Sequence, residues 1–212
     1  EEVSKAIGMD SRIGSRFLKT SVGFGGSCFQ KDILNLVYIS RSLGLKKVAD
    51  YWEQVLIINK HQRDRFSKKI IDLVRKENLE PKVLVLGWAF KKDTNDTRES
   101  AAIYVANNLI NNDIKIDVYD PKVSEKQVDF DLSFLNENYD KSLIKFIEDP
   151  MSNISEYNLI AIMTEWEEFK NYDWSKIYSF IKKPAFIFDG RNILDMREIK
   201  EIGFNYNGLG RK

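Results

Sequence analysis

The chain is poor in the residues that stabilise small folds through disulfides or zinc. Its 212 residues include one cysteine, Cys28, and one histidine, His61. One cysteine cannot form an internal disulfide, and with a single histidine it cannot complete a usual structural zinc site, so we expect no metal. This composition fits a reducing compartment, and we expect a cytoplasmic protein with a free thiol.

Long hydrophobic runs and an excess of charge of one sign are also lacking. The longest apolar stretches, such as Val83 to Leu86 and Leu159 to Met163, are far too short to span a bilayer, and no secretory segment opens the chain. The 33 basic and 32 acidic residues give a net charge of +1. We therefore expect neither nucleic acid nor a membrane as a partner, and any polyanion must be bound by a local cluster of charge.

The first part of the chain has the spacing of apolar residues that is typical of helices. The pattern starts at the first residues, with Val3 and Ile7, and is interrupted by a glycine-rich loop at 17–29. A helix is expected from about Gln30 to just before Gly44, and a longer one from Val48 to about Glu77. With about 29 residues and 1.5 Å of rise for each, the longer helix would measure roughly 40 Å, which suits a spine between domains or subunits.

Beyond Pro81 short apolar runs alternate with helical stretches, which is typical of a parallel α/β sheet. Strands are expected at 82–87, 114–119, 158–163 and 185–189, with weaker ones near 143–147 and 204–207. Helices are expected at about 98–111, 173–182 and 195–201, whereas 121–140 is too polar to assign. We predict an α/β protein with a helical central region at 1–78, which contains the long spine helix, and a Rossmann-like parallel-sheet domain at 79–212.

The glycine-rich loop carries the strongest chemical signal. Glycines let backbone N–H groups approach a ligand closely, and the following helix adds free N–H groups and the positive end of its dipole. Cys28 lies just before that helix, where the dipole and Lys31 favour a thiolate over a thiol. Asp32 lies one turn on, on the same face, where a carboxylate would exchange protons with groups bound at the sulfur, although its charge opposes the thiolate. This arrangement is typical of a nucleophilic cysteine.

Simpler explanations of these residues remain open. Most free cysteines are small buried hydrophobic residues, and many glycine-rich loops are only sharp turns. His61, in the middle of the long helix, is better explained as a surface or packing residue than as a base. Hydrolysis driven by a histidine is therefore poorly supported, because it would need His61 to reach the cysteine loop.

Two further segments follow predicted strands, at the sheet edge where open parallel sheets bind ligands. The segment from Gly87 to Ser100 brings Lys91 and Arg98 to this edge, and Phe188 to Asn192 adds Arg191. These cations would suit a phosphate group, and a solvated charged loop is the alternative.

The segment after Gly87 matches the dinucleotide-binding fingerprint only in part. Ala89 and Lys92 occupy the later glycine positions of that pattern. Asp96 or Thr97 is expected to be the N-cap of the helix that follows. The fingerprint alone would therefore not predict a dinucleotide site here.

Four segments resemble the UDP-glucose/GDP-mannose dehydrogenase family, in particular its eukaryotic UDP-glucose 6-dehydrogenases. They are, in the order of that family, Phe17 to Asp32 (FLKTSVGFGGSCFQKD), Gly87 to Ser100 (GWAFKKDTNDTRES), Tyr119 to Lys122 (YDPK) and Phe188 to Arg191 (FDGR). The resemblance runs from end to end of the chain, and it favours a catalytic role for Cys28.

The resemblance implies oxidation of the C6 hydroxymethyl group of UDP-glucose to the carboxylate of UDP-glucuronate, with two hydrides passed to two NAD. In this family the loop cysteine, here Cys28, captures the intermediate aldehyde as a thiohemiacetal. Loss of a second hydride gives a thioester, which water cleaves. Asp32 matches the aspartate that helps to activate this water and to position the thiol.

The resemblance also implies two sets of binding residues. Those expected to contact the nucleotide sugar are Arg12 (in a neighbouring subunit), Lys19, Thr20, Ser21, Val22, Gly23, Phe24, Gly25, Phe90, Lys91 and Arg191. Those expected to face NAD are Cys28, Phe29, Gln30, Lys31 and Arg98.

By the same resemblance, the N-terminal NAD-binding domain of the family is missing, together with its catalytic lysine, asparagine and glutamate. We expect the 212 residues to fold, to form a homodimer or a higher homo-oligomer through the long helix and to bind UDP-sugars weakly, without turnover. Two alternatives stay open. One is a dehydrogenase for GDP-mannose or another nucleotide sugar, and the other is a non-catalytic module for nucleotide-sugar binding or dimerisation.

Overall fold

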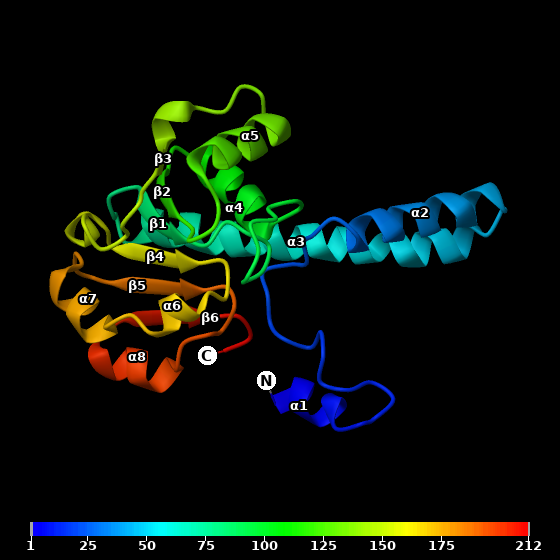
Figure 1. Cartoon of the computed structure of the whole chain (residues 1–212), viewed down its shortest axis with the longest axis horizontal. Helices are drawn as coiled ribbons and strands as arrows, with labels where there is room; N and C mark the ends of the chain where they lie inside the picture. Colours follow the sequence, from blue (N-terminus) through cyan, green and yellow to red (C-terminus); the bar gives the residue numbers. More distant parts are fainter. Residues whose placement is uncertain (1, 212) are drawn as a thin grey trace.

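A long helical hairpin extends from one side of a six-stranded sheet in the computed structural model, which describes residues 2–211 (Figure 1). The strands are β1 (Lys82–Leu86), β2 (Lys115–Tyr119), β3 (Ile144–Phe146), β4 (Leu159–Ile162), β5 (Phe186–Asp189) and β6 (Asn205–Gly208). The helices are α1 (Glu2–Gly8), α2 (Phe29–Ser42), α3 (Lys46–Lys76), α4 (Ala101–Ile110), α5 (Glu125–Leu135), α6 (Glu167–Lys170), α7 (Trp174–Phe180) and α8 (Met196–Ile202), with short 3-10 turns η1 (Lys141–Leu143) and η2 (Ile154–Glu156). The predicted α/β fold is confirmed.

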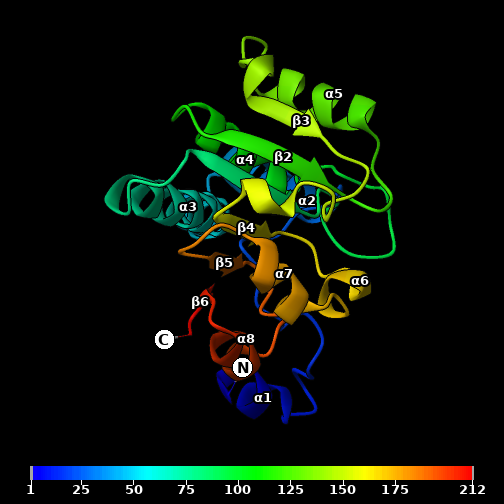
Figure 2. The ribbon, with the colours of Figure 1, turned by 90° about the vertical axis from the view of Figure 1, so that its left-hand side faces the viewer.

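The sheet has the order β3-β2-β1-β4-β5-β6, and every neighbouring pair is parallel. In Figure 2 the strands follow one another from β3 at the top to β6 at the bottom. The apolar strands β4 and β5 are buried at every residue, as expected for strands covered on both faces. The chain reverses its direction of progress across the sheet between β1 and β4, which is where open sheets leave a crevice at the carboxyl ends of their strands.

The predicted strand positions are confirmed to within a residue at their ends, including the two weaker ones. The polar segment 121–140 contains a helix, α5, whose N-cap Ser124 accepts a hydrogen bond from the Gln127 N–H and which buries Val128 and Leu132. The weak periodicity of this segment concealed a helix that packs through only a few residues.

Some helix ends differ from the expected ones by one or two residues, and the start of α4 differs most. The helix expected at 98–111 begins at Ala101, and its N-cap is Ser100 rather than Asp96 or Thr97. Glu99 adopts a left-handed conformation (φ 55°), which stops helical structure from extending back through it. The Asp96 carboxylate binds the backbone and side chain of Arg98 instead of capping the helix.

The long helix α3 has 31 residues and belongs to two packing environments. Its C-terminal part buries Phe66, Ile70 and Val74 in the core of the sheet region, where the Phe66 ring lies 5.9 Å from the ring of Phe188 in β5. Its N-terminal part packs against α2 around the buried residues Ile33, Val37 and Ala49. The helix is therefore the physical link between the hairpin and the sheet, and the division of the chain at residues 78 and 79 stays a prediction.

The outer faces of the hairpin carry large apolar side chains that nothing within the described residues covers. Exposed examples are Tyr38, Leu43, Tyr51 and Ile58. Across residues 2–211 no helix combines the length and the hydropathy needed to cross a membrane.

Candidate active site

The glycine-rich loop before α2 is held by two side chains of α3. The Asn59 amide forms a pair of hydrogen bonds with the backbone of Phe24, accepting its N–H at 2.9 Å and donating to its carbonyl at 3.2 Å. Arg63, one turn further along α3, donates to the same carbonyl at 2.7 Å. The loop is thus ordered by tertiary contacts as well as by its own sequence.

Close backbone contact explains two of the loop's glycines. A Cβ at Gly25 would lie 2.5 Å from the carbonyl oxygen of Glu99, so any side chain there would push the loop away from the turn before α4. Gly26 has a φ of 89°, which favours glycine, and its N–H donates to the Arg98 carbonyl at 2.8 Å. The loop and this turn therefore meet backbone to backbone.

Cys28 is exposed and is the residue that immediately precedes α2. Its sulfur lies 3.5 Å from the Ser27 hydroxyl, and its carbonyl accepts the Asp32 N–H at 2.9 Å within the first turn of the helix. Lys31 and Asp32 are exposed beside it. The thiol is open to a reactant, as a nucleophile must be.

Arg98 lies within electrostatic range of this thiol. The pKa of Arg98 is raised, chiefly by its hydrogen bond with Asp96 and, to the smallest extent, by the charge of Cys28. The structure therefore brings together Cys28, the Phe24 to Gly26 stretch, and the Phe90 and Arg98 side of the turn after β1.

Arg191 approaches the start of the loop from the carboxyl end of β5. Its guanidinium donates to the Ser21 hydroxyl at 2.8 Å and pairs with Glu165 at 2.6 Å. Burial lowers the pKa of Arg191, while Glu165 and Asp189 oppose that shift. Val22, the next residue of the loop, is buried and packs closely against Gly190. A Cβ added at Gly190 would lie 2.5 Å from a methyl carbon of Val22.

A fully buried carboxylate, Asp189, shapes the turn that presents Arg191. It accepts the Arg191 N–H at 3.0 Å, the Leu194 N–H at 2.9 Å and the Tyr206 hydroxyl at 3.0 Å. Burial raises the pKa of Asp189, and these hydrogen bonds offset part of that increase. Asp189 is not among the site residues expected from the sequence, although its place at the end of an apolar strand was a usable signal.

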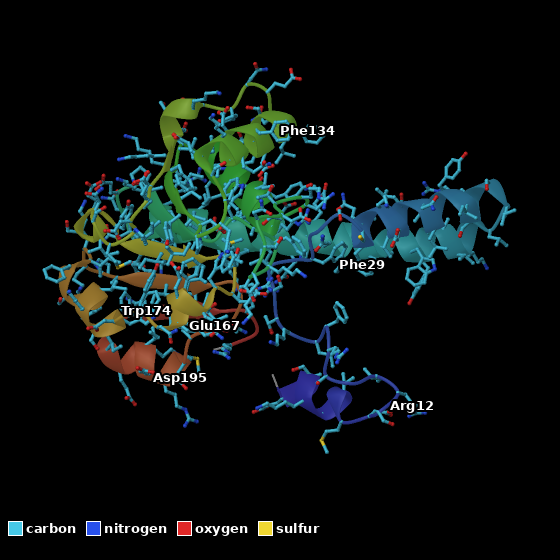
Figure 3. The ribbon with its side chains drawn as sticks, in the orientation of Figure 1. Arg12, Phe29, Phe134, Glu167, Trp174 and Asp195 are labelled. Carbon is cyan, nitrogen blue, oxygen red and sulfur yellow. The ribbon has the colours of Figure 1, made fainter. Side chains whose placement is uncertain are left out.

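A cleft of about 340 Å³ opens between this sheet edge and the N-terminal segment. The cations that line it are Lys5, Lys19, Lys92, Lys170 and Arg191. Two carboxylates, Glu165 and Glu167, also line it, and Figure 3 labels Glu167 at the edge of the sheet region. Hydrogen bonds from Lys92, at 2.6 Å, and then Lys170 lower the pKa of Glu167 to about 2.

The expected substrate residues do not all lie in the cleft. Lys19, Thr20 and Arg191 line it. Lys91 was expected there, but its neighbour Lys92 lines the cleft instead. Ser21 contacts Arg191, and the stretch from Val22 to Gly25 runs from the core to the turn that carries Phe90.

The last two expected substrate residues are not among those that line the cleft. Lys91 is exposed, with its ammonium 5.4 Å from the ring of Phe90. Arg12 is exposed in the N-terminal segment, where Figure 3 labels it, and pairs with Asp10 at 2.6 Å. Among the expected cofactor residues, Phe29, Lys31 and Arg98 are exposed and Gln30 is half-buried.

The turn after β1 holds an internal anion. The Asp120 carboxylate, almost fully buried, accepts the N–H groups of Trp88 and Ala89 at 2.7 and 3.0 Å and the indole N–H of Trp166 at 3.1 Å. In dinucleotide-binding folds these backbone N–H groups point to a pyrophosphate. A pyrophosphate does not fit at this turn, because the N–H groups of Trp88 and Ala89 already donate to Asp120. Its negative charge would also be repelled by the Asp120 carboxylate.

No group of three or more His, Cys, Asp or Glu within residues 2–211 is arranged to hold a metal ion.

Two family models match the chain. The UDP binding domain of the UDP-glucose/GDP-mannose dehydrogenase family matches residues 84–196, and the central domain of the same family matches residues 1–61. The first of these models contains the sheet strands β4 and β5 and the Arg191 turn, and the second contains the cysteine loop.

Known proteins of similar sequence and structure agree with these models. The chain is 47% identical to UDP-glucose 6-dehydrogenase from Drosophila melanogaster over 215 residues, and 47% identical to the enzyme of that name from Gallus gallus over 217. Each match covers 100% of this chain but only 45% and 44% of the relative. A solved UDP-glucose dehydrogenase from Pyrobaculum islandicum superposes with a TM-score of 0.75 and 27% identity, over 98% of this chain and 42% of that one. The chain therefore spans less than half the length of these relatives.

Proposed function

The chain belongs to the UDP-glucose/GDP-mannose dehydrogenase family, and on this premise we propose that it supplies the reactive thiol and the UDP-binding part of a UDP-glucose 6-dehydrogenase. The observation that carries the proposal is the exposed Cys28 on a loop that Ser21 and Arg191 join to a cationic cleft. The overall reaction would oxidise UDP-glucose to UDP-glucuronate, as the names of the relatives suggest.

The cleft has the charge that a nucleoside diphosphate needs. Five cationic side chains line it, and two carboxylates balance only part of their charge. Arg191 is held in place by Ser21 and Glu165, so a diphosphate would meet a guanidinium whose position is already fixed. We assign the diphosphate to Lys19 and Arg191, and the sugar to the stretch from Thr20 to Gly25 and to Phe90 and Lys91.

Cys28 would then act on the aldehyde form of the sugar. Its thiolate adds to the C6 carbonyl carbon and forms a C–S bond, with no change in oxidation state, and the carbonyl oxygen takes up a proton. At the thioester stage, water attacks the acyl carbon, the C–S bond breaks, and the thiol and the carboxylate product separate. Asp32, exposed one turn after Cys28, would accept the proton of the attacking water.

The two oxidations need a hydride acceptor. NAD, when bound, would supply it for the conversion of alcohol to aldehyde and of thiohemiacetal to thioester. The turn after β1 does not fit its pyrophosphate, because Asp120 occupies the backbone donors. We therefore propose that this chain contributes only a wall of the cofactor site, made of Cys28, Phe29, Gln30, Lys31 and Arg98, and that by itself it does not turn over.

Protection of the thiol tests the proposal directly. Intact mass measured after iodoacetamide treatment follows alkylation of Cys28, the only cysteine of the chain, and Cys28→Ser is the control for labelling elsewhere. We expect UDP-glucose to slow alkylation roughly tenfold at saturation, as occupancy of the cleft would cover the loop.

Two alternative functions predict different results. A site for guanosine nucleotides would be protected better by GDP-mannose than by UDP-glucose, and a non-catalytic module would show no protection by either. Production of NADH from this chain with UDP-glucose and NAD would contradict the expected inactivity.

We further propose that the chain forms a homodimer through the hairpin. The exposed apolar side chains of α2 and α3, among them Tyr38, Leu43, Tyr51 and Ile58, support this proposal, because large apolar patches on a surface are typical of protein interfaces.

A further inference from the structure

Two polar residues, Asn59 and Arg63, lie on the side of α3 that is otherwise apolar. Their side chains are only 6% and 4% exposed, and the following turns on the same side bury Phe66 and Ile70 in the core. Placing an amide and a guanidinium in such a position costs free energy unless their hydrogen bonds are made. Asn59 makes two hydrogen bonds with the cysteine loop and Arg63 makes one, while Arg63 donates a further one to the Glu99 carbonyl.

Three segments of the protein meet at the Arg63 guanidinium. Nη2 donates to the Phe24 carbonyl at 2.7 Å and to the Glu99 carbonyl at 3.0 Å. The guanidinium carbon lies 4.0 Å from the centre of the Tyr104 ring of α4, and Nη1 lies 3.8 Å from the Glu99 carboxylate. One side chain of the long helix therefore contacts the cysteine loop, the turn before α4, and α4 itself.

These contacts differ from those at the start of the loop. Val22 is buried in the core of the sheet region and Ser21 is bonded to Arg191, so that end of the loop is fixed without Arg63. Among the described residues, the hydrogen bonds that join the stretch from Phe24 to Cys28 to other segments are those of Asn59 and Arg63 and the one from the Gly26 N–H to the Arg98 carbonyl. Gly25 and Gly26 also pack against Glu99 and Phe90. Cys28 lies at the far end of this second part.

We propose that Arg63, together with Asn59, is a positioning residue that sets the place of Cys28 relative to the nucleotide-sugar cleft. It acts through the backbone of Phe24 and does not touch the sulfur. The inference depends on the proposed function for the identity of the ligand, but the ordering of the loop by Arg63 can be measured without any ligand.

Three variants separate the donors of Arg63 from its bulk. Arg63→Met keeps an apolar stem and removes every donor, and Arg63→Lys keeps one cation but loses the planar guanidinium that lies against the Tyr104 ring. Arg65→Met, at an exposed position two residues further along α3, is the matched control. Should Arg63→Met fail to fold, Asn59→Asp tests the same clamp, because it keeps the acceptor for the Phe24 N–H and loses the donor to the Phe24 carbonyl.

The first measurement is deuterium exchange of the peptide that spans residues 23–28. We expect exchange to accelerate roughly tenfold or more in Arg63→Met, less in Arg63→Lys, and not at all in Arg65→Met. Exchange in β4 and β5 should stay unchanged in all of them. Exchange of the loop at the wild-type rate in Arg63→Met, or in Asn59→Asp where the former does not fold, would overturn the proposal.

The second measurement separates positioning from general support of the fold. UDP lacks the glucosyl group of UDP-glucose, so its dissociation constant, measured by calorimetry, should stay within about twofold in Arg63→Met because Arg191 and Ser21 remain in place. Protection of Cys28 from iodoacetamide by UDP-glucose should fall from about tenfold to below about twofold. Equal weakening of both effects would show a merely structural role and overturn the inference.

The wild-type chain separates the two proposals. If UDP-glucose fails to protect its Cys28, the proposed function is wrong, while the exchange result still decides whether Arg63 positions the loop. If protection occurs in the wild type and persists in Arg63→Met, the proposed function holds and the positioning role is wrong.

Discussion

The sheet region and the helical hairpin differ in how far they bury their apolar residues. Around the sheet, Leu84, Ile160 and Phe169 are completely buried within a large continuous core. In α2 and the part of α3 that packs against it, the buried apolar residues of the described chain are Ile33, Val37 and Ala49, while Tyr38 is 72% and Tyr51 69% exposed. The two regions share α3, so the contrast arises within one helix rather than between two separate parts.

This contrast shows which region can stand alone. A sheet covered on both faces by its own helices removes its apolar surface from water without help. A two-helix hairpin has a single seam, so the apolar residues on its outer faces remain exposed in one chain. Cys28 lies where the two regions meet, at the start of α2, and Figure 3 labels its neighbour Phe29 at this junction.

The largest effect should come from truncating the core of the sheet region. Leu84→Ala is expected to lower the free energy of unfolding by about 2 to 5 kcal/mol, since it removes buried methyl groups and leaves a cavity. Leu34→Ala, at a hairpin position that is 51% exposed, should cost less than about 1 kcal/mol. Urea unfolding followed by circular dichroism measures both, and similar losses would contradict the contrast between the regions.

The next effect concerns the contact between the two regions. Gly25→Ala should destabilise the protein by about 1 to 3 kcal/mol, because the new Cβ would meet the Glu99 carbonyl 2.5 Å away. Ser27→Ala changes the same loop without a clash and should cost less than about 0.5 kcal/mol. If thermal unfolding shows no difference between the two variants, the loop is not packed as closely as described.

A smaller effect is expected from making the hairpin surface polar. The double variant Tyr51→Ser and Ile58→Ser should weaken self-association at least about tenfold, since it removes two exposed apolar side chains of the proposed dimer contact. Phe134→Ser, on α5 and also exposed, is the control from the sheet region and should leave self-association unchanged. Sedimentation velocity decides, and equal behaviour of the two variants would argue against a dimer through the hairpin.

The smallest effect is a local change of charge in the cleft. Lys92→Met should raise the pKa of Glu167 from about 2 toward its ordinary value of 4.5, because Lys92 is the main cause of the low value. A carboxyl group with a lowered folded pKa stabilises the fold fully above its unfolded pKa, and that stabilisation is lost as the pH falls through about 2. Carbon-detected NMR titration measures the shift, with Lys182→Met, whose partner is Glu80, as the control.

Strand positions could be predicted well because the central strands are continuous apolar runs between turn residues. The glycine-rich loop could be recognised for a different reason, because three glycines and the single cysteine of the sequence lie within six residues. The start of α4 could not be predicted, because Asp96, Thr97 and Ser100 are all acceptable N-caps and only the left-handed Glu99 decides between them.

The side chains that hold the site were harder to find. Neither Asn59 nor Arg63 is among the site residues that the sequence predicts. A charged residue one turn after a polar one on a buried helix face was a usable signal, but its partner is a backbone carbonyl more than thirty residues away. Contacts of this kind depend on the tertiary arrangement of the helix and the loop. The local sequence around either residue does not specify that arrangement.

The carboxylate of Asp120 has a consequence for protein engineering. If glycines were introduced after β1, the backbone N–H groups of residues 88 and 89 would still donate to the Asp120 carboxylate. Added flexibility alone would therefore not create affinity for a nucleotide cofactor. Removing that side chain would have to come first, and it would also free the indole of Trp166 and the backbone of Lys122 and Val123. The backbone donors that bind a ligand phosphate in related folds here bind a carboxylate of the protein itself.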